Sequence, residues 1–167
     1  KCRLEQILPV LLPPLQTRFS DIEILVANGS HVLQLEEKIR ELVSAKVFEN
    51  FPVYQHDAKD ESALVTVGTT SYGTVIQLNK KAVEADVVVT IGGVLYHYFA
   101  GFGGGAKMLM PGVAGYESIR TNHSLSIARH NLQFHPECRE GNIWTNPIYL
   151  DCIQVLQFLK NVHSLQV

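Results

Sequence analysis

The chain has 167 residues, of which 46% are hydrophobic and 18% charged, and its net charge is −2. A charge so close to zero gives no electrostatic reason to expect nucleic acid as a partner, and the apolar runs are too short to span a membrane. The cysteines Cys2, Cys138 and Cys152 are widely spaced and form no CxxC motif, so neither a disulfide framework nor a zinc ribbon is predicted. We expect one cytoplasmic domain comprising residues 1–167.

The N-terminal third predicts helices alternating with short strands. Apolar residues at helical spacing indicate a helix over residues 3–18, which its prolines should shorten or kink. Residues 22–27 read as a buried strand that ends in the turn Asn28-Gly29. Residues 51–56 predict another short strand. The helix between these strands should bury one apolar face, made of Leu35, Ile39, Leu42 and Val43.

The middle of the chain contains its clearest strand signals. Residues 63–68 and 74–79 predict two strands separated by a turn, and residues 80–85 predict a short helix. Residues 86–93 follow as an unbroken β-branched run that stops at two glycines. Such a run is typical of a strand buried on both faces, as in a parallel or mixed central sheet.

The last third predicts two helices, over residues 115–130 and 146–162. Asn146 suits the N-cap of the second helix, and Pro147 suits its first position. Strands that alternate with helices indicate the α/β class. We therefore predict a Rossmann-like three-layer sandwich with a mostly parallel central sheet.

A glycine-rich loop follows the predicted strand at residues 86–93, and Lys107 comes just after it. The glycines of this loop are Gly101, Gly103, Gly104 and Gly105. Glycine runs after strands commonly let backbone N–H groups approach a phosphate. The P-loop pattern fails at Ala106 and Met108, and a formal GxGxxA match lies too far from the strand and lacks its acidic ribose partner. Lys107 could neutralise a phosphate or act as a reactive amine.

Three histidines lie beside turns or glycines, namely His31, His97 and His123. The ends of neighbouring strands in an open α/β sheet converge on one crevice, so these side chains could meet there. Imidazole is an acid/base group near neutral pH and a ligand for nickel, zinc or copper. The residues alone therefore leave open a nucleotide- or phosphate-binding domain without chemistry, a three-histidine zinc-dependent hydrolase, and a His/Lys enzyme that acts on a phosphate-bearing ligand.

Longer stretches of the sequence resemble a known family. "VANGSH", "VGTTSYGTVIQLNKKAVEADVVVTIGGVLYHYFAGFGGGAKMLMPGVAGYESIRTNH" and "NPIYLD" are similar to the N-terminal domain of the nickel-pincer-nucleotide-dependent lactate racemases. The most specific part is the combination H-x9-K-x15-H around a GFxGG loop. The resemblance covers most of residues 22–152.

The resemblance implies a cofactor and a role for each residue. The family's cofactor is a nickel ion held by a thiolated pyridinium mononucleotide. Lys107 matches the lysine that tethers it through a thioamide, His123 matches the nickel ligand, and His31 and His97 match the paired acid/base histidines. The loop glycines, Gly101, Gly103, Gly104 and Gly105, would lie against the mononucleotide. The implied reaction racemises or epimerises a small 2-hydroxy acid by hydride transfer through a planar 2-keto acid.

The sequence also departs from the family pattern. Val32 follows His31 where family members commonly carry arginine, and Gly103 stands where the loop often has serine. Both changes bear on the substrate more than on the cofactor. The family's N-terminal arginine motif and its C-terminal domain have no match, so we expect the chain to be part of a longer enzyme. Its remaining domains would then be partners of this one, and the fragment alone should have little turnover.

Overall fold

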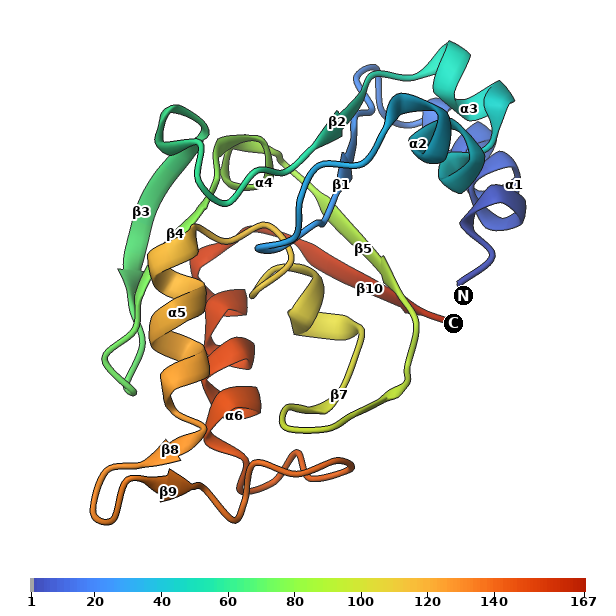
Figure 1. Ribbon diagram of the computed structural model, residues 1–167. Coiled ribbons are helices and arrows are strands. Elements are labelled where there is room, and N and C mark those ends of the chain that lie inside the picture. Colours follow the sequence, from blue (N-terminus) through green and yellow to red (C-terminus); the bar gives the residue numbers. More distant parts are fainter. Residues whose placement is uncertain (1) are drawn as a thin grey trace.

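The structure is a computed structural model that describes residues 2–167. Figure 1 shows the first half of the chain as a small helical group, two short strands and an antiparallel pair. Its elements are α1 (Leu4–Gln16), β1 (Ile24–Val26), α2 (Glu36–Val43), α3 (Ala45–Asn50), β2 (Val53–Gln55), the 3-10 turn η1 (Glu61–Ala63), β3 (Leu64–Thr69), β4 (Val75–Asn79) and α4 (Lys80–Glu84).

The second half of the chain begins with the longest strand predicted from the sequence, and its last strand pairs with that first one. Its elements are β5 (Val88–Gly92), β6 (Tyr96–His97), β7 (Gly101–Phe102), the 3-10 turn η2 (Gly105–Met108), α5 (Tyr116–Ser124), β8 (Ile127–Ala128), β9 (Gln133–Phe134), α6 (Pro147–Gln154), the 3-10 turn η3 (Val155–Phe158) and β10 (Val162–Gln166). None of the helices described in residues 2–167 is long and apolar enough to cross a membrane.

The fold is of the mixed α/β class, as predicted, but the strands pair in twos. β1 pairs with β2 and β5 with β10, both in parallel, whereas β3 and β4 are antiparallel. β6–β7 and β8–β9 form short hairpins. The single, mostly parallel central sheet expected from the sequence is therefore not confirmed in the described residues.

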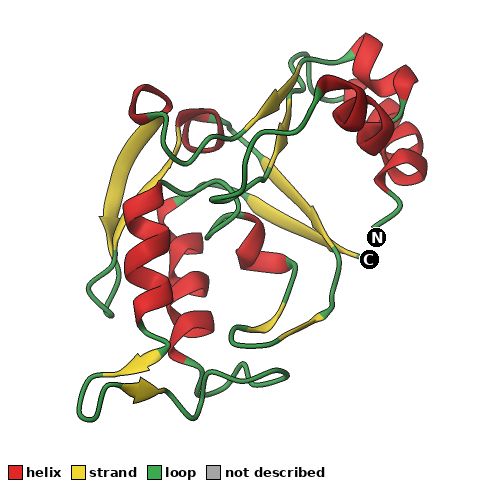
Figure 2. Ribbon diagram, in the orientation of Figure 1, coloured by secondary structure: helices red, strands yellow, loops and turns green. Residues whose placement is uncertain are grey.

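Helices lie on both sides of the parallel strands (Figure 2), and each group of helices packs on a hydrophobic core. In β1, Ile24 contributes to a core with α1–α3, and Leu25 contributes to a larger core beneath α5 and α6. In β5, Ile91 joins the first core and Val88 joins the second. Successive side chains of a strand point to opposite faces, so these short strands separate two helical layers.

The N-terminal helices differ from the prediction in two respects. α1 is one continuous helix of 13 residues, somewhat shorter than the predicted 3–18, and all three prolines lie inside it without breaking it. In α2, Ile39 and Val43 are buried, but Leu35 precedes the helix and is 72% exposed. Leu35 therefore does not belong to the buried face.

The two C-terminal helices end earlier than predicted. α5 stops at Ser124, and Ile127 enters the β8–β9 hairpin. The Ser126 hydroxyl and amide both donate to the His123 carbonyl, and this satisfies an acceptor at the end of the helix. α6 ends at Gln154, and the rest of the predicted helix is the 3-10 turn η3 followed by a bend over residues 159–161. The bend leads into β10, which pairs with β5 from Val162 with Val88 to Gln166 with Gly92.

Candidate functional site

A two-stranded hairpin presents His97. β6 and β7 pair through His97 and Gly101, and the ring of Tyr96 stacks on Phe102 with centroids 5.1 Å apart. His97 Nδ1 accepts a hydrogen bond from the Ala100 backbone N–H at 3.2 Å. In the neutral ring this acceptor role leaves the proton on Nε2.

The glycines of the loop are explained partly by the fold itself. Gly101 and Gly104 have φ values of +82° and +74°, a region that other residues rarely adopt. A Cβ on Gly101 would lie 2.3 Å from the Asn142 carbonyl oxygen, and one on Gly104 would lie 3.1 Å from the Gly93 carbonyl oxygen. By contrast, a Cβ on Gly105 would meet nothing closer than 3.9 Å. Of these three glycines, Gly105 alone has open space beside it.

Lys107 lies in η2 and is only 8% exposed. Its backbone N–H donates to the Gly104 carbonyl, and the start of the turn is held by Gln166 of β10, whose Oε1 accepts from the Gly105 N–H at 3.0 Å. No group in residues 2–167 accepts a hydrogen bond from its Nζ. Burial lowers the pKa of the Lys107 ammonium to about 8. A measurable fraction of the amine is therefore uncharged, and hence nucleophilic, near neutral pH.

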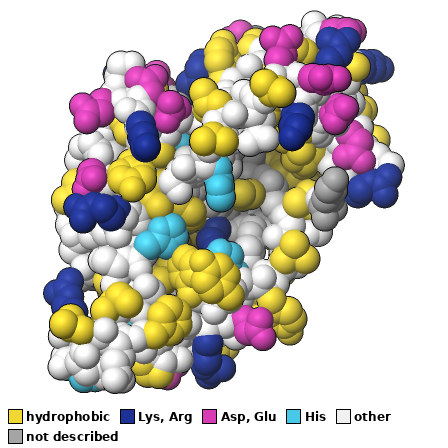
Figure 3. All heavy atoms as spheres, viewed as in Figure 1, with side chains coloured by type: hydrophobic (Ala, Val, Ile, Leu, Met, Phe, Trp, Pro, Cys, Tyr) yellow, Lys and Arg dark blue, Asp and Glu magenta, His cyan; other side chains and the backbone are white. Residues whose placement is uncertain are grey.

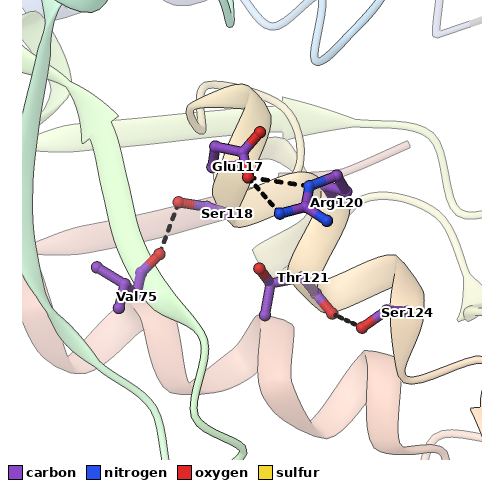
Figure 4. A network of polar contacts seen from close by, with 6 residues as sticks. All are labelled: Val75, Glu117, Ser118, Arg120, Thr121 and Ser124. Carbon is purple, nitrogen blue, oxygen red and sulfur yellow. Dashed lines mark hydrogen bonds and ion pairs between the residues drawn. The ribbon is translucent and has the colours of Figure 1, made fainter.

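Helix α5 carries His123 and is fixed to β4 from one side. The Ser118 hydroxyl donates to the Val75 carbonyl at 2.7 Å (Figure 4) and accepts from the Gln77 N–H at 2.9 Å. The Glu117–Arg120 ion pair in the same view lies on the exposed face of the helix. The buried Ser118 contacts therefore set where His123 lies, while the ion pair contributes little.

A buried carboxylate fixes α5 from the other side. Asp151 of α6 is fully buried and accepts hydrogen bonds from Thr70 Oγ1, Thr74 Oγ1 and Asn122 Nδ2. The two threonines come from the β3–β4 turn, and Asn122 precedes His123. This network ties three segments together at the base of the histidine, and it satisfies a buried group that would otherwise be costly.

The Phe99 ring lies between three of the candidate site side chains, those of His97, Lys107 and His123. Its centroid is 4.6 Å from that of His97 and 5.1 Å from that of His123, both edge to face, and Lys107 Nζ lies 5.9 Å from it. The Phe99 carbonyl accepts from Asn146 Nδ2 at 2.9 Å. Asn146 Oδ1 also accepts from the first N–H groups of α6, so the predicted N-cap is confirmed and also anchors the ring.

Electrostatics favour the uncharged forms of both histidines. Burial, and next the charges of Lys107 and His123, lower the pKa of His97 to about 4. Burial and the Lys107 charge likewise lower the pKa of His123. Burial also raises the pKa of the adjacent Cys152 thiol to about 12. Near neutral pH the site therefore holds two neutral imidazoles, which can accept protons or bind a metal.

His31 is placed differently from the other predicted site residues. It is exposed, in the turn after β1, and its backbone N–H donates to Asn28. Within residues 2–167 its ring makes no hydrogen bond or ring contact with His97 or His123. Its loop does reach the Lys107 segment, because the Gly29 N–H donates to the Gly112 carbonyl at 2.8 Å. Figure 3 shows histidine side chains around a basic side chain in a hollow of this face.

The described residues offer no multi-histidine metal centre. No group of three or more His, Cys, Asp or Glu side chains in residues 2–167 is placed to hold a metal ion. Phe99 separates His97 from His123, and His31 lies on the exposed loop. The three-histidine zinc site considered from the sequence therefore has no support in the structure.

Sequence reasoning missed three residues that shape the site. Phe99 and Asp151 gave no signal, because an aromatic residue in a loop and an acidic residue in a helix are ordinary. Asn146 was noticed only as a helix cap. All three act through contacts between segments far apart in the chain, which no local pattern contains.

Fold and site together define an α/β domain that holds a buried amine next to two neutral imidazoles. The family model of the lactate racemase N-terminal domain matches residues 1–134, and the chain belongs to this family. It is 33% identical to the lactate racemase of Lactiplantibacillus plantarum over 156 residues, which are 92% of this chain and 36% of that protein. It is 32% identical to that of Thermoanaerobacterium thermosaccharolyticum over 162 residues, or 93% of this chain and 37% of that protein.

Solved structures agree with this assignment. The lactate racemase apoprotein from Thermoanaerobacterium thermosaccharolyticum matches 98% of this chain and 39% of that one, with a TM-score of 0.87 and 28% identity. A Thermotoga maritima protein shares the fold over 91% of this chain and 40% of that one, with a TM-score of 0.70 and 20% identity. The chain thus spans somewhat more than a third of the length of the curated relatives it matches.

Proposed function

We propose that this chain forms the cofactor- and proton-handling part of a racemase or epimerase of small 2-hydroxy acids. The observation that carries the proposal is the convergence of His97, Lys107 and His123 around Phe99 in a chain of the lactate racemase N-terminal domain family. The named relatives are lactate racemases. Val32 and Gly103 depart from the family pattern near the substrate, so the proposal extends to 2-hydroxy acids other than lactate.

The residues present fit a covalently held nickel-pincer nucleotide. Lys107 supplies a buried amine whose pKa is lowered to about 8, so a usable fraction of it can be acylated near neutral pH. His123 supplies a neutral imidazole, which is the form that binds a metal. Gly105, two residues before Lys107, has open space where a Cβ would lie. When bound, this group supplies a nickel-centred hydride acceptor that the side chains of the chain cannot provide.

The remaining histidines have complementary proton roles in this proposal. His97, with its proton on Nε2, can donate a hydrogen bond to the substrate oxygen at the chiral carbon. His31, on its exposed loop, can take the hydroxyl proton on one side of the substrate and return it after the carbon has been planar. The Phe99 ring contacts both half-buried imidazoles edge to face and lies beside the Lys107 amine.

We also propose that β1–β2 and β5–β10 belong to one mostly parallel sheet of a Rossmann-like domain. Both pairs are parallel. Their alternate residues face the same two cores, with Ile24 and Ile91 in one and Leu25 and Val88 in the other. The isolated chain should have little turnover, because groups that bind the substrate carboxylate and close the site would come from the rest of the protein.

Intact-mass analysis of the full-length protein tests the proposal. The protein is produced together with cofactor-synthesis enzymes, and the expected spectrum carries a mass adduct with bound nickel. Lys107→Ala should remove the adduct, whereas Lys46→Ala, on the exposed surface of α3, should retain it. His123→Ala should reduce the nickel content but keep the adduct.

Other outcomes point to other functions. An adduct that survives Lys107→Ala contradicts the tether. Reversible nucleotide binding without nickel or an adduct would instead indicate a nucleotide-binding domain. Bound zinc in place of nickel would support a zinc-dependent hydrolase if substitution of each of His31, His97 and His123 removed it.

A further inference from the structure

His56 is a buried histidine that the proposed reaction does not use. It is fully buried and directly follows β2. Its Nε2 donates to the Ala114 carbonyl at 2.9 Å, and its Nδ1 accepts from Asn79 Nδ2 at 3.2 Å. Both ring nitrogens are therefore satisfied in a single neutral tautomer.

The backbone of the same residue holds the other side of the site. The His56 N–H donates to the Val26 carbonyl at 3.0 Å, and the His56 carbonyl accepts from Asn28 Nδ2 at 3.2 Å. Asn28 begins the turn that carries His31, and its Nδ2 also donates to Gln55 Oε1. The exposed His31 loop is thus anchored through His56 and its neighbour.

The ring of His56 points to the segment that joins Lys107 to His123. Ala114 lies between Lys107 and His123, and α5 begins two residues after it. The backbone N–H of Asn79 donates to the Val113 carbonyl at 2.9 Å, while its side-chain amide contacts the His56 ring. Asn79 therefore holds both the segment and the ring. His56 therefore contacts both parts of the candidate site: its backbone bonds to the His31 loop, and its ring bonds to the segment between Lys107 and His123.

We propose that His56 is a positioning residue that keeps the His31 loop in register with the segment carrying Lys107 and His123. The proposal rests on the proposed function, because it assigns His31 and His97 to opposite sides of one substrate. Gly29 adds a single further link, to Gly112, at 2.8 Å. Loss of the His56 ring leaves the backbone bonds of His56 and the two Gln34–Gln55 bonds in place, so it should loosen the loop relative to this segment without unfolding the domain.

Charge supports this arrangement. Burial lowers the pKa of His56, and the Ala114 carbonyl and the Asp57 carboxylate oppose that effect more weakly. The ring therefore stays neutral near pH 7. A protonated ring would direct a second donor at the Asn79 amide, which is itself a donor here.

Matched substitutions in the full-length, cofactor-loaded enzyme test the proposal. His56→Leu removes both ring contacts, whereas His56→Gln retains one donor and one acceptor. We expect His56→Leu to lower kcat at least tenfold with a smaller change in KM, and His56→Gln to recover most of that loss. His130→Leu, in the exposed turn between β8 and β9, is the control and should leave kcat within twofold of wild type.

Hydrogen exchange of the unloaded protein gives a second readout that needs no activity. His56→Leu should raise exchange in residues 27–31 and 112–115 while α1 stays protected. Asn28→Ala releases the same loop from its other anchor and covers the case in which His56→Leu does not fold. Its exchange should rise in residues 27–31.

Three results would overturn the proposal. These are unchanged kcat in a folded His56→Leu protein, a uniform rise in exchange along the whole chain, and failure of His56→Gln to recover activity. If wild-type enzyme shows no racemase activity, the proposed function fails. The exchange pattern would still report whether His56 anchors the loop.

Discussion

Residues 99–112, the buried half of the candidate site, contain the glycine-rich loop and Lys107. Residues 30–35, the exposed half, contain His31, and the two segments are built in opposite ways. No residue in 99–112 is exposed, whereas every residue in 30–35 is. The first segment is enclosed by α5, α6 and β10. The second is held by hydrogen bonds near Asn28 and Gly29 at one end and by two between Gln34 and the Gln55 side chain at the other. The buried half therefore has its geometry and its pKa values set by packing, while the exposed half is free to respond to substrate or to the rest of the protein.

The largest effect should come from the carboxylate beneath the buried half. Asp151→Ala leaves Thr70, Thr74 and Asn122 without their acceptor, and we expect the free energy of unfolding to fall by about 3–5 kcal/mol. Urea denaturation measures this. Glu117→Ala, which removes an exposed ion pair, should cost no more than about 1 kcal/mol. Equal losses in the two variants would mean that Asp151 does not organise the site.

The buried charge of Lys107 should lower the free energy of unfolding. Its pKa falls from 10.5 to about 8, so the folded state binds fewer protons than the unfolded state between these values. The penalty is then complete below pH 8 and disappears as the pH rises to about 10.5. Lys107→Met should stabilise the protein by up to about 3 kcal/mol at pH 7, and by progressively less above pH 8. Thermal unfolding at several pH values checks this, and a gain that does not depend on pH would contradict it.

A smaller loss is expected where the buried half meets α6. Asn146→Ala removes a helix cap together with the hydrogen bond to the Phe99 carbonyl, and should cost about 1–2 kcal/mol. Asn146→Ser keeps a capping oxygen but loses the reach to Phe99. If the Asn146–Phe99 bond matters for the site, Asn146→Ser should unfold like wild type but bind nickel less well. Equal nickel content would show that Asn146 acts only as a cap.

A substitution in the exposed half should lower activity without lowering stability. His31→Ala removes an exposed side chain, so the free energy of unfolding should change by no more than about 0.5 kcal/mol. Turnover of the loaded full-length enzyme should fall by about 100-fold or more, because an acid/base group is lost. Turnover within threefold of wild type would remove His31 from the mechanism.

The smallest effect on activity is expected from a substitution of Val32, the residue after His31. Val32 is 80% exposed, and Val32→Arg restores the residue common in the family. Stability should stay within about 0.5 kcal/mol of wild type. A guanidinium here should lower KM for a carboxylate-bearing substrate and leave kcat nearly unchanged. An unchanged KM for every 2-hydroxy acid tested would place Val32 away from the substrate.

Local sequence patterns predicted elements wherever the signal was contained within a few residues. The β-branched run at β5, the turn at Asn28 and the Asn146-Pro147 start of α6 are examples, and each is found in the structure. Prediction failed where distant residues decided the outcome. The helix predicted over residues 146–162 ends at Gln154, because the chain must turn there to place β10 beside β5, more than 70 residues earlier.

The sequence by itself determined the family, the class of fold and the residue types at the candidate site. The class of fold follows from the alternation of strand and helix patterns, whereas the family was indicated by the resemblance of the stretches that contain His97, Lys107 and His123. Only the tertiary structure decided that Phe99 lies between these side chains, that Lys107 is buried without an acceptor in residues 2–167, and that His31 stays exposed. The physical reason is desolvation, because a pKa depends on which atoms exclude water from a group, and those atoms come from every part of the chain.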